Sequence, residues 1–247
     1  MRRAIWMGIA ALLVFGVLLV ARFPARWAGA WLPAGVTCQR LAGTLWNGRC
    51  AGLTANGSLI GDARWTLHPA RLLAGRLGGD VALTRAGLDV RGEIEATPRG
   101  NLVARNLQVL VPLDRAVVPQ APPNLRGTVR AQLARLAASG RTITQIEGRI
   151  EALGLVQGAG AGGVTLGDYV VTFPAAPAAE EPVGALQDLR GPLDVSGSLR
   201  LTREPGFVLE GLVAARPDAT PQLARQLEYL GRPDAAGRRP FSIAGTF

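Results

Sequence analysis

The strongest constraint on the fold is an alternation of apolar and polar residues that recurs along the chain. It is clearest in residues 88–95, where Leu, Val, Gly and Ile occupy every second position between charged residues. The same alternation returns in residues 125–133, 146–150 and 193–201. Because successive side chains of a β-strand point to opposite faces, each segment predicts a strand with one apolar and one solvated face.

The segments between these strands carry the turn residues of an antiparallel meander. Turn signals occur at residues 86–87, 98–101, 139–140 and 204–206, all of which contain glycine. One-sided strands must bury their apolar face, either against a second sheet or by curling the sheet on itself. The sequence therefore predicts a mainly β domain, built as a curved antiparallel sheet or as a sandwich.

Glycine also recurs on the apolar face of the predicted strands. It stands at positions 92, 127, 148, 197 and 211. Two interpretations stay open. These residues permit strong curvature or close approach of neighbouring backbones, or they are ordinary bend and turn glycines.

One or two short helices are expected beside the strands. Pro69–Ala74 is the first candidate. The clearer one is Pro221–Leu230, with Thr220 as N-cap, proline at the first helical position and Gly231 after the end. A closing strand is predicted over Arg239–Phe247.

Two segments rich in proline and alanine look like loops or linkers. They cover residues 121–124 and 174–182. The first of them could divide the β-rich part of the chain into two halves.

An uncharged apolar run over residues 4–21 precedes the β-rich part. At ~1.5 Å per residue, it can cross a hydrocarbon core ~30 Å thick. A cleaved signal peptide usually has a shorter apolar region of about 7–15 residues. We therefore expect a retained transmembrane helix, with residues 1–22 as cytoplasmic tip and anchor. Residues 23–247 are then expected to form a periplasmic domain, because so short a leading tail readily stays in the cytoplasm.

The two cysteines, Cys38 and Cys50, are expected to form one disulfide in an oxidising compartment, close to the membrane exit. A two-residue hairpin turn at Asn47-Gly48 conflicts with this pairing, because it would place Cys38 far along the opposite strand. Three alternatives stay open at this point. Asn47-Gly48 is a bulge or bend, the chain folds back before Leu41, or the two thiols stay unpaired.

The basic residues do not predict nucleic-acid binding. All 27 of them are arginine, and with 18 acidic residues they give a net charge of +9. They are spread over the chain, usually within a few positions of Asp or Glu, without a basic cluster interleaved with aromatic residues. Nucleic acid is therefore not expected as a partner.

No pattern of catalytic residues emerges. His68 is the only histidine and has no sequence partner that marks it as a base, and one His with two Cys gives no metal-ligand spacing. Gly158, Gly160 and Gly163 match a dinucleotide-binding pattern, but strand-like residues 164–173 follow them instead of a helix. We expect no catalytic residue, cofactor, metal or small-molecule substrate, and hence no enzyme.

A series of short motifs follows in order along the chain. They are Gly43–Gly48, Ala63–Leu67 with Pro69, Leu72–Gly75, Leu166–Tyr169, Leu230–Asp234 with Gly237, and a final Phe-x-x-x-Gly-x-Phe. With one N-terminal apolar run, and over nearly the whole chain, these motifs resemble the protein N family of bacterial type II secretion systems. The chain is also similar to the wider group of membrane-anchored, β-rich periplasmic proteins of the AsmA type.

This resemblance implies a non-enzymatic accessory component of the inner membrane, which helps to export folded periplasmic proteins across the outer membrane through protein–protein contacts. The partners it implies are the outer-membrane secretin and the inner-membrane platform. It assigns no catalytic residue and no role to Cys38 and Cys50. The alternative is a periplasmic lipid-handling groove protein, because a curled sheet with an apolar inner face could shield acyl chains.

Overall fold

The chain folds into two compact units, Met1–Arg85 (unit 1) and Ala86–Phe247 (unit 2). The computed structural model describes residues 15, 22–25, 35–113, 124–158, 163–176 and 181–246. The expected anchor over residues 4–21 lies outside the described residues, apart from Phe15. None of the described helices is both long and apolar enough to cross a membrane.

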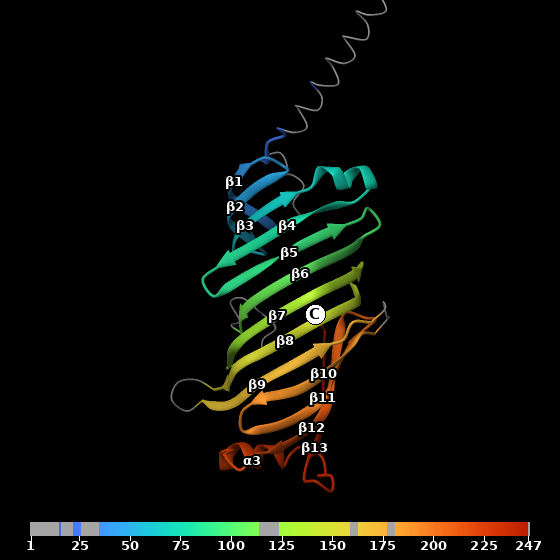
Figure 1. The fold of residues 1–247 in the computed structure, drawn as a ribbon. Helices are drawn as coiled ribbons and strands as arrows, with labels where there is room; N and C mark the ends of the chain where they lie inside the picture. Colours follow the sequence, from blue (N-terminus) through green and yellow to red (C-terminus); the bar gives the residue numbers. More distant parts are fainter. Residues whose placement is uncertain are drawn as a thin grey trace, which may run out of the picture. The chain divides into compact units, whose positions relative to one another are not determined.

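Unit 1 is an antiparallel meander with a short 3₁₀ helix (Figure 1), in which each described strand pairs with its neighbour in sequence. Its elements are β1 (Val36–Gly43), β2 (Asn47–Ala55), β3 (Ser58–Leu67), η2 (Pro69–Ala74) and β4 (Leu77–Arg85). The short helix predicted over Pro69–Ala74 is thus confirmed in its bounds, with 3₁₀ geometry.

The first hairpin settles the conflict over Asn47-Gly48. A turn closed by a hydrogen bond from the Thr44 amide to the Asn47 carbonyl (2.9 Å) joins β1 to β2, so both Asn47 and Gly48 belong to strand β2. The Asn-Gly turn with positive φ at both residues lies instead at Asn56-Gly57, where φ is 49° and 79°. Strand β2 therefore starts at Asn47 and pairs with β1 along its length, from Gly48 opposite Gly43 to Ala55 opposite Val36.

Unit 2 is a longer meander, again with antiparallel pairing between described strands that follow one another. Its elements (Figure 1) are β5 (Leu88–Ala96), β6 (Asn101–Pro112), β7 (Leu125–Ser139), β8 (Thr142–Gln157), β9 (Val164–Phe173), β10 (Val183–Arg190), β11 (Leu193–Thr202), β12 (Gly206–Ala215), α3 (Pro221–Leu227) and β13 (Arg239–Thr246). The strands predicted from alternation fall within β5, β7, β8 and β11, which confirms a mainly β antiparallel fold.

Unit 2 covers its apolar face by curling the sheet. Thr142 at the start of β8 donates a hydrogen bond to the Arg203 carbonyl after β11 (2.9 Å), although β9 and β10 lie between these strands in the sheet. Leu133 of β7, Ile146 of β8 and Leu201 of β11 belong to one buried cluster. Of the two predicted ways to bury the apolar face, the described part of unit 2 therefore uses curvature.

Close backbone approach explains the glycines on the inner face. Gly197 of β11 lies opposite Gly211 of β12. A Cβ atom on Gly197 would lie 2.1 Å from the Glu210 carbonyl oxygen, and one on Gly148 would lie 2.2 Å from the Gln132 carbonyl oxygen. These positions leave no room for a side chain, so the close-approach interpretation is confirmed at both.

Both units contain the same β-bulge, which the sequence reading missed. In unit 1, β2 bulges against β3 at Gly52 (φ 72°), whose amide donates to the Asp62 carboxylate (2.9 Å). In unit 2, β8 bulges against β9 at Gly154 (φ 60°), whose amide donates to Asp168 (2.6 Å). The carboxylate thus satisfies the amide that the bulge removes from the ladder.

Helix α3 begins as predicted, because the Thr220 hydroxyl accepts a hydrogen bond from the Leu223 amide (3.3 Å) and proline follows the cap. The predicted end was wrong, since α3 stops at Leu227 instead of Leu230. The amides from Glu228 to Leu230 bond to carbonyls three residues back, which tightens the chain out of the α-helix. The predicted closing strand is β13, and Phe247 lies outside the described residues.

Candidate functional site

The concave face of unit 2 holds a cavity of about 750 Å³. Strands β7 to β13 and helix α3 all contribute to its wall. The lining residues are Val129, Ile150, Ala152, Leu155, Leu166, Tyr169, Val171, Leu186, Leu193, Val195, Leu199, Leu201, Phe207, Leu209, Val213, Leu227, Leu230, Phe241, Ser242 and Ile243. None of these side chains carries a charge, so the cavity is an apolar site.

Strand alternation places these apolar residues inside the curl. Along β11, Leu193, Val195 and Leu201 are buried. The intervening residues Asp194 and Arg200 are polar and exposed. Helix α3 covers part of this face, because Leu223 packs in the same buried cluster as Val195. The apolar wall therefore follows from two features: apolar residues alternate along each strand, and the sheet curls so that these residues face inward.

The cavity opens beside β13, the last strand. Phe241 and Ile243 line it from this strand, and Leu209 of β12 lies directly opposite Ile243. Ile243 lines the cavity and is nevertheless 54% exposed to solvent, so the cavity is open at this residue. An apolar side chain in this position marks the solvent-facing side of the site.

The polar side chains of Tyr169 and Asp188 beside the cavity are already paired. The Tyr169 hydroxyl donates to the Leu166 carbonyl (2.5 Å). Asp188 accepts hydrogen bonds from the Val195 amide (2.9 Å) and from Arg216 (2.6 Å). Burial, and to a smaller extent the neighbouring Asp188 carboxylate, raises the pKa of Tyr169 to about 12. Tyr169 is therefore a neutral, satisfied part of the wall.

A second ion pair belongs to the bulge of unit 2. Asp168 accepts from the Gly154 amide and from Arg190 (Nη2 to Oδ2, 2.8 Å). These hydrogen bonds, the one from Gly154 first, lower the pKa of Asp168 below its usual value. Its carboxylate is engaged on both oxygens, so its role is to hold the bulge together.

Arg239 is the first residue of β13, beside which the cavity opens, and it lies close to the end of α3. It stands opposite Val213, a lining residue, and its Nη1 donates to the carbonyls of Leu230 (3.3 Å) and Gly231 (3.0 Å). In the described part of the chain no carboxylate lies within ion-pair distance of Arg239, in contrast to Arg216. This cation was not singled out from the sequence, because only the tertiary structure brings it to the cavity.

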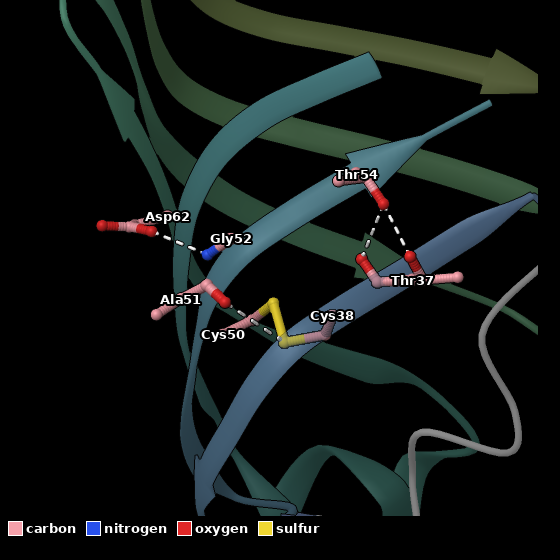
Figure 2. Close-up of a disulfide and its surroundings, with 7 residues drawn as sticks. All are labelled: Thr37, Cys38, Cys50, Ala51, Gly52, Thr54 and Asp62. Carbon is pink, nitrogen blue, oxygen red and sulfur yellow. Dashed lines mark hydrogen bonds between the residues drawn. A yellow bond between two sulfur atoms is a disulfide. The ribbon is translucent and has the colours of Figure 1, made fainter. Parts of the chain in front are cut away.

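The two cysteines are joined in the structure. The disulfide between Cys38 on β1 and Cys50 on β2 has its Cα atoms 5.9 Å apart (Figure 2). The register places Cys38 opposite Leu53, and the bulge at Gly52 bends β2 between Leu53 and Cys50. The Thr37 and Thr54 hydroxyls, 2.6 Å apart, bridge the same two strands (Figure 2).

The other candidates for chemistry have structural surroundings. The His68 ring lies 3.4 Å from the Asp80 carboxylate, and both side chains are well exposed. Gly158 and Gly163 precede strand β9, as the sequence predicted, instead of a helix. Within the described residues no three His, Cys, Asp or Glu side chains are grouped so as to hold a metal ion.

Comparison with known proteins agrees with the motif order. The model of the family "Type II secretion system (T2SS), protein N" matches residues 34–242, which is most of the chain. The chain belongs to the type II secretion system protein N family. A protein N of this family from Vibrio cholerae serotype O1 is 26% identical over 254 residues, covering 99% of each chain. No solved structure matches the chain.

The protein N motifs found in the sequence are structural elements in the fold. The motif Gly43–Gly48 contains the turn between β1 and β2, together with the strand residues on either side of it. The motif Leu166–Tyr169 supplies both the Asp168 carboxylate of the bulge and Tyr169 of the cavity wall. The motif Leu230–Asp234 follows α3, where Leu230 lines the cavity. The motifs therefore specify turns, a bulge and an apolar wall.

Proposed function

We propose that this chain is a non-enzymatic accessory component of the type II secretion apparatus, which helps to export folded periplasmic proteins. The observation that carries this proposal is the protein N family match over residues 34–242. The Vibrio cholerae relative, which bears the name of protein N of this apparatus and aligns over 99% of both chains, supports the same role. The proposed partners are the outer-membrane secretin and the inner-membrane platform.

The proposed location is the inner membrane, with residues 23–247 in the periplasm. The uncharged apolar run over residues 4–21 supports a single anchor, because its length suits a hydrocarbon core. The disulfide between Cys38 and Cys50 supports an oxidising compartment such as the periplasm.

The proposed working surface is the free edge of β13. Among the described strands, β13 pairs with β12 alone, so its other edge offers backbone N–H and C=O groups. Natural edge strands are usually blunted by charge or proline, yet from Phe241 to Thr246 this edge has neither. Such an edge suits the addition of a strand from a partner protein.

Photocrosslinking in cells that carry the whole apparatus tests this surface. A photoreactive residue at the exposed position Ala244 of β13 should form an adduct with the secretin or with a platform component. The same residue at Thr172, exposed on the interior strand β9, is the matched control and should give no such adduct. Normal secretion without an adduct from position 244 would contradict the edge as the working surface.

Point variants test the non-enzymatic role. Ala244→Lys should lower secretion while the protein keeps its fold, because a charge at the edge opposes strand addition. Thr172→Lys is the control for the added charge. His68→Ala should leave secretion unchanged. Loss of secretion with a normally folded His68→Ala protein would instead reveal a chemical site and contradict this role.

A reporter that is active only in the periplasm tests the topology. Fused after Phe247, it should be active, and the purified protein should still contain Met1 to Ala21. An N-terminus processed near Trp31 would contradict the anchor.

A further inference from the structure

We propose that the cavity of unit 2 binds a single acyl chain carrying an anionic head group, with Arg239 as the head-group contact. This inference goes beyond the proposed role in secretion and does not depend on it. It rests on the size of the cavity, the chemistry of its wall, the place of its opening and the charge beside that opening.

The size fits a small ligand. The cavity holds about 750 Å³, within the range of roughly 300–1,000 Å³ typical of small-molecule sites. Side chains from β7 to β13 leave this space open even though Leu186, Val195 and Val213 around it are nearly fully buried. The wall is therefore formed by well-packed residues, and the remaining space is available to a guest molecule.

The wall selects hydrocarbon. Its side chains are apolar except for Ser242, which lies exposed on β13, and Tyr169, whose hydroxyl is engaged with the Leu166 carbonyl. A sugar, a nucleotide or a peptide backbone would lose hydrogen bonds with water here and gain none. An acyl chain has no hydrogen bonds to lose and gains by leaving water. The part of the ligand inside the cavity is therefore a hydrocarbon chain.

The opening places the head group. The cavity faces solvent along β13, where Ile243 is 54% exposed, while Leu227 and Leu230 bound it on the α3 side. An amphiphile would thread its chain inward past Ile243 and leave its polar end at the rim. Arg239 stands on the same strand, two positions before Phe241, and so on the same face as the lining residues.

The charge at the rim selects an anion. Arg239 uses Nη1 for the carbonyls of Leu230 and Gly231, which leaves its other N–H groups directed at no carboxylate in the described part of the chain. The neighbouring cations differ, since Arg216 pairs with Asp188 and Arg238 pairs with Asp234. A planar guanidinium with free donors is suited to a carboxylate or a phosphate oxygen pair.

Photolabelling of the full-length chain tests the proposal. The protein is reconstituted in vesicles of phosphatidylethanolamine and phosphatidylglycerol and irradiated with palmitate that carries a diazirine on its chain. Labelled peptides should come from residues 125–246, which span the lining strands β7 to β13, and excess unlabelled palmitate or lysophosphatidylglycerol should prevent the labelling. Competition by only one of these two identifies the source of the head group. Label confined to residues 1–33, or competition by neither amphiphile, would overturn the proposal.

Variants on the two faces of β13 provide the matched control. Ile243→Trp fills the opening and should abolish labelling of residues 125–246, whereas Ala244→Trp on the opposite face should not change it. Far-ultraviolet circular dichroism checks the fold of both. If the tryptophan variant does not fold, Ile243→Asp replaces it. This variant adds a charge instead of bulk and should also abolish the labelling. Equal labelling of the Ile243 and Ala244 variants would overturn the site.

The head-group contact has its own test. Arg239→Gln should weaken competition by palmitate about tenfold, the loss expected for one charge-assisted hydrogen bond. Arg200→Gln on β11, which removes the same charge elsewhere in unit 2, should leave competition unchanged. Neutral hexadecanol should compete more weakly than palmitate with the unaltered protein. Equal competition by hexadecanol and palmitate would overturn the assignment of Arg239.

Discussion

Breaking the disulfide between Cys38 and Cys50 should destabilise unit 1 selectively. The perturbation is the double variant Cys38→Ser/Cys50→Ala, in which alanine replaces the buried cysteine, only 3% exposed, so that no hydroxyl is buried. The magnitude follows from the loop that the bond closes. A separation of 12 residues corresponds to about 3 kcal/mol of lost stability in the chain-entropy model.

Urea unfolding of the purified full-length protein measures this loss. All 5 tryptophans lie in unit 1, and the Trp65 indole donates to the Leu45 carbonyl (2.9 Å), so tryptophan fluorescence follows this unit. With a denaturant dependence of about 1–3 kcal/mol/M, the midpoint should fall by about 1–3 M urea. The tyrosines Tyr169 and Tyr229 lie in unit 2, and their signal provides the internal control.

Reduction of the unaltered protein gives an independent check. A thiol reductant should lower its tryptophan-detected midpoint to that of the double variant, and the double variant should not respond to the reductant. An unchanged midpoint, after thiol labelling has shown that the bond was opened, would refute the claim that this disulfide stabilises unit 1. Full labelling of both thiols before reduction would refute the bond itself.

Two further predictions concern unit 2. Gly197→Ala should cost about 1–3 kcal/mol in tyrosine-detected urea unfolding, because its Cβ would lie 2.1 Å from a carbonyl oxygen. Gly231→Ala, where the Cβ would meet only two ring atoms of Pro240, 3.2 and 3.8 Å away, should cost less, and equal costs would contradict the close backbone approach. In a Tyr229→Phe variant, absorbance at 295 nm should show the remaining Tyr169 ionising near the pKa of about 12 that burial imposes. Since an unfolded tyrosine ionises near pH ~10, the contribution of Tyr169 to stability is complete below that pH and should be lost as pH rises toward 12; ionisation near 10 in the folded protein would contradict its burial.

The local elements of this fold could be predicted from the sequence because their causes are local. Alternation in residues 88–95 and 193–201 indicates strands wherever the partners lie, since side-chain direction depends only on the backbone of the strand itself. Thr220 caps α3 through a residue three positions away. The end of α3 was missed because Gly231 ends the turns that follow the helix, whereas no residue type marks the change from α to 3₁₀ hydrogen bonding after Leu227.

The family could also be recognised from sequence, because its motifs include turns and a bulge, in which the residue type is restricted at each position. Leu166–Tyr169 illustrates why recognition did not disclose the role of the motif. The Asp168 carboxylate serves a bulge whose glycine, Gly154, lies on the preceding strand. The same device in unit 1, with Asp62 serving Gly52, became visible only once the strand pairing was known.

The site itself was decided by tertiary structure. The sequence indicated an apolar inner face and hence a groove, but which residues meet across it depends on the curl that lets Thr142 reach the Arg203 carbonyl. That curl accumulates from strand twist, bulges and close glycine contacts over many pairings, and each of these involves residues far apart in the chain. Whether Arg239 lies at the rim is likewise a property of register, because one residue of slip in β13 would turn it to the other face together with Phe241 and Ile243.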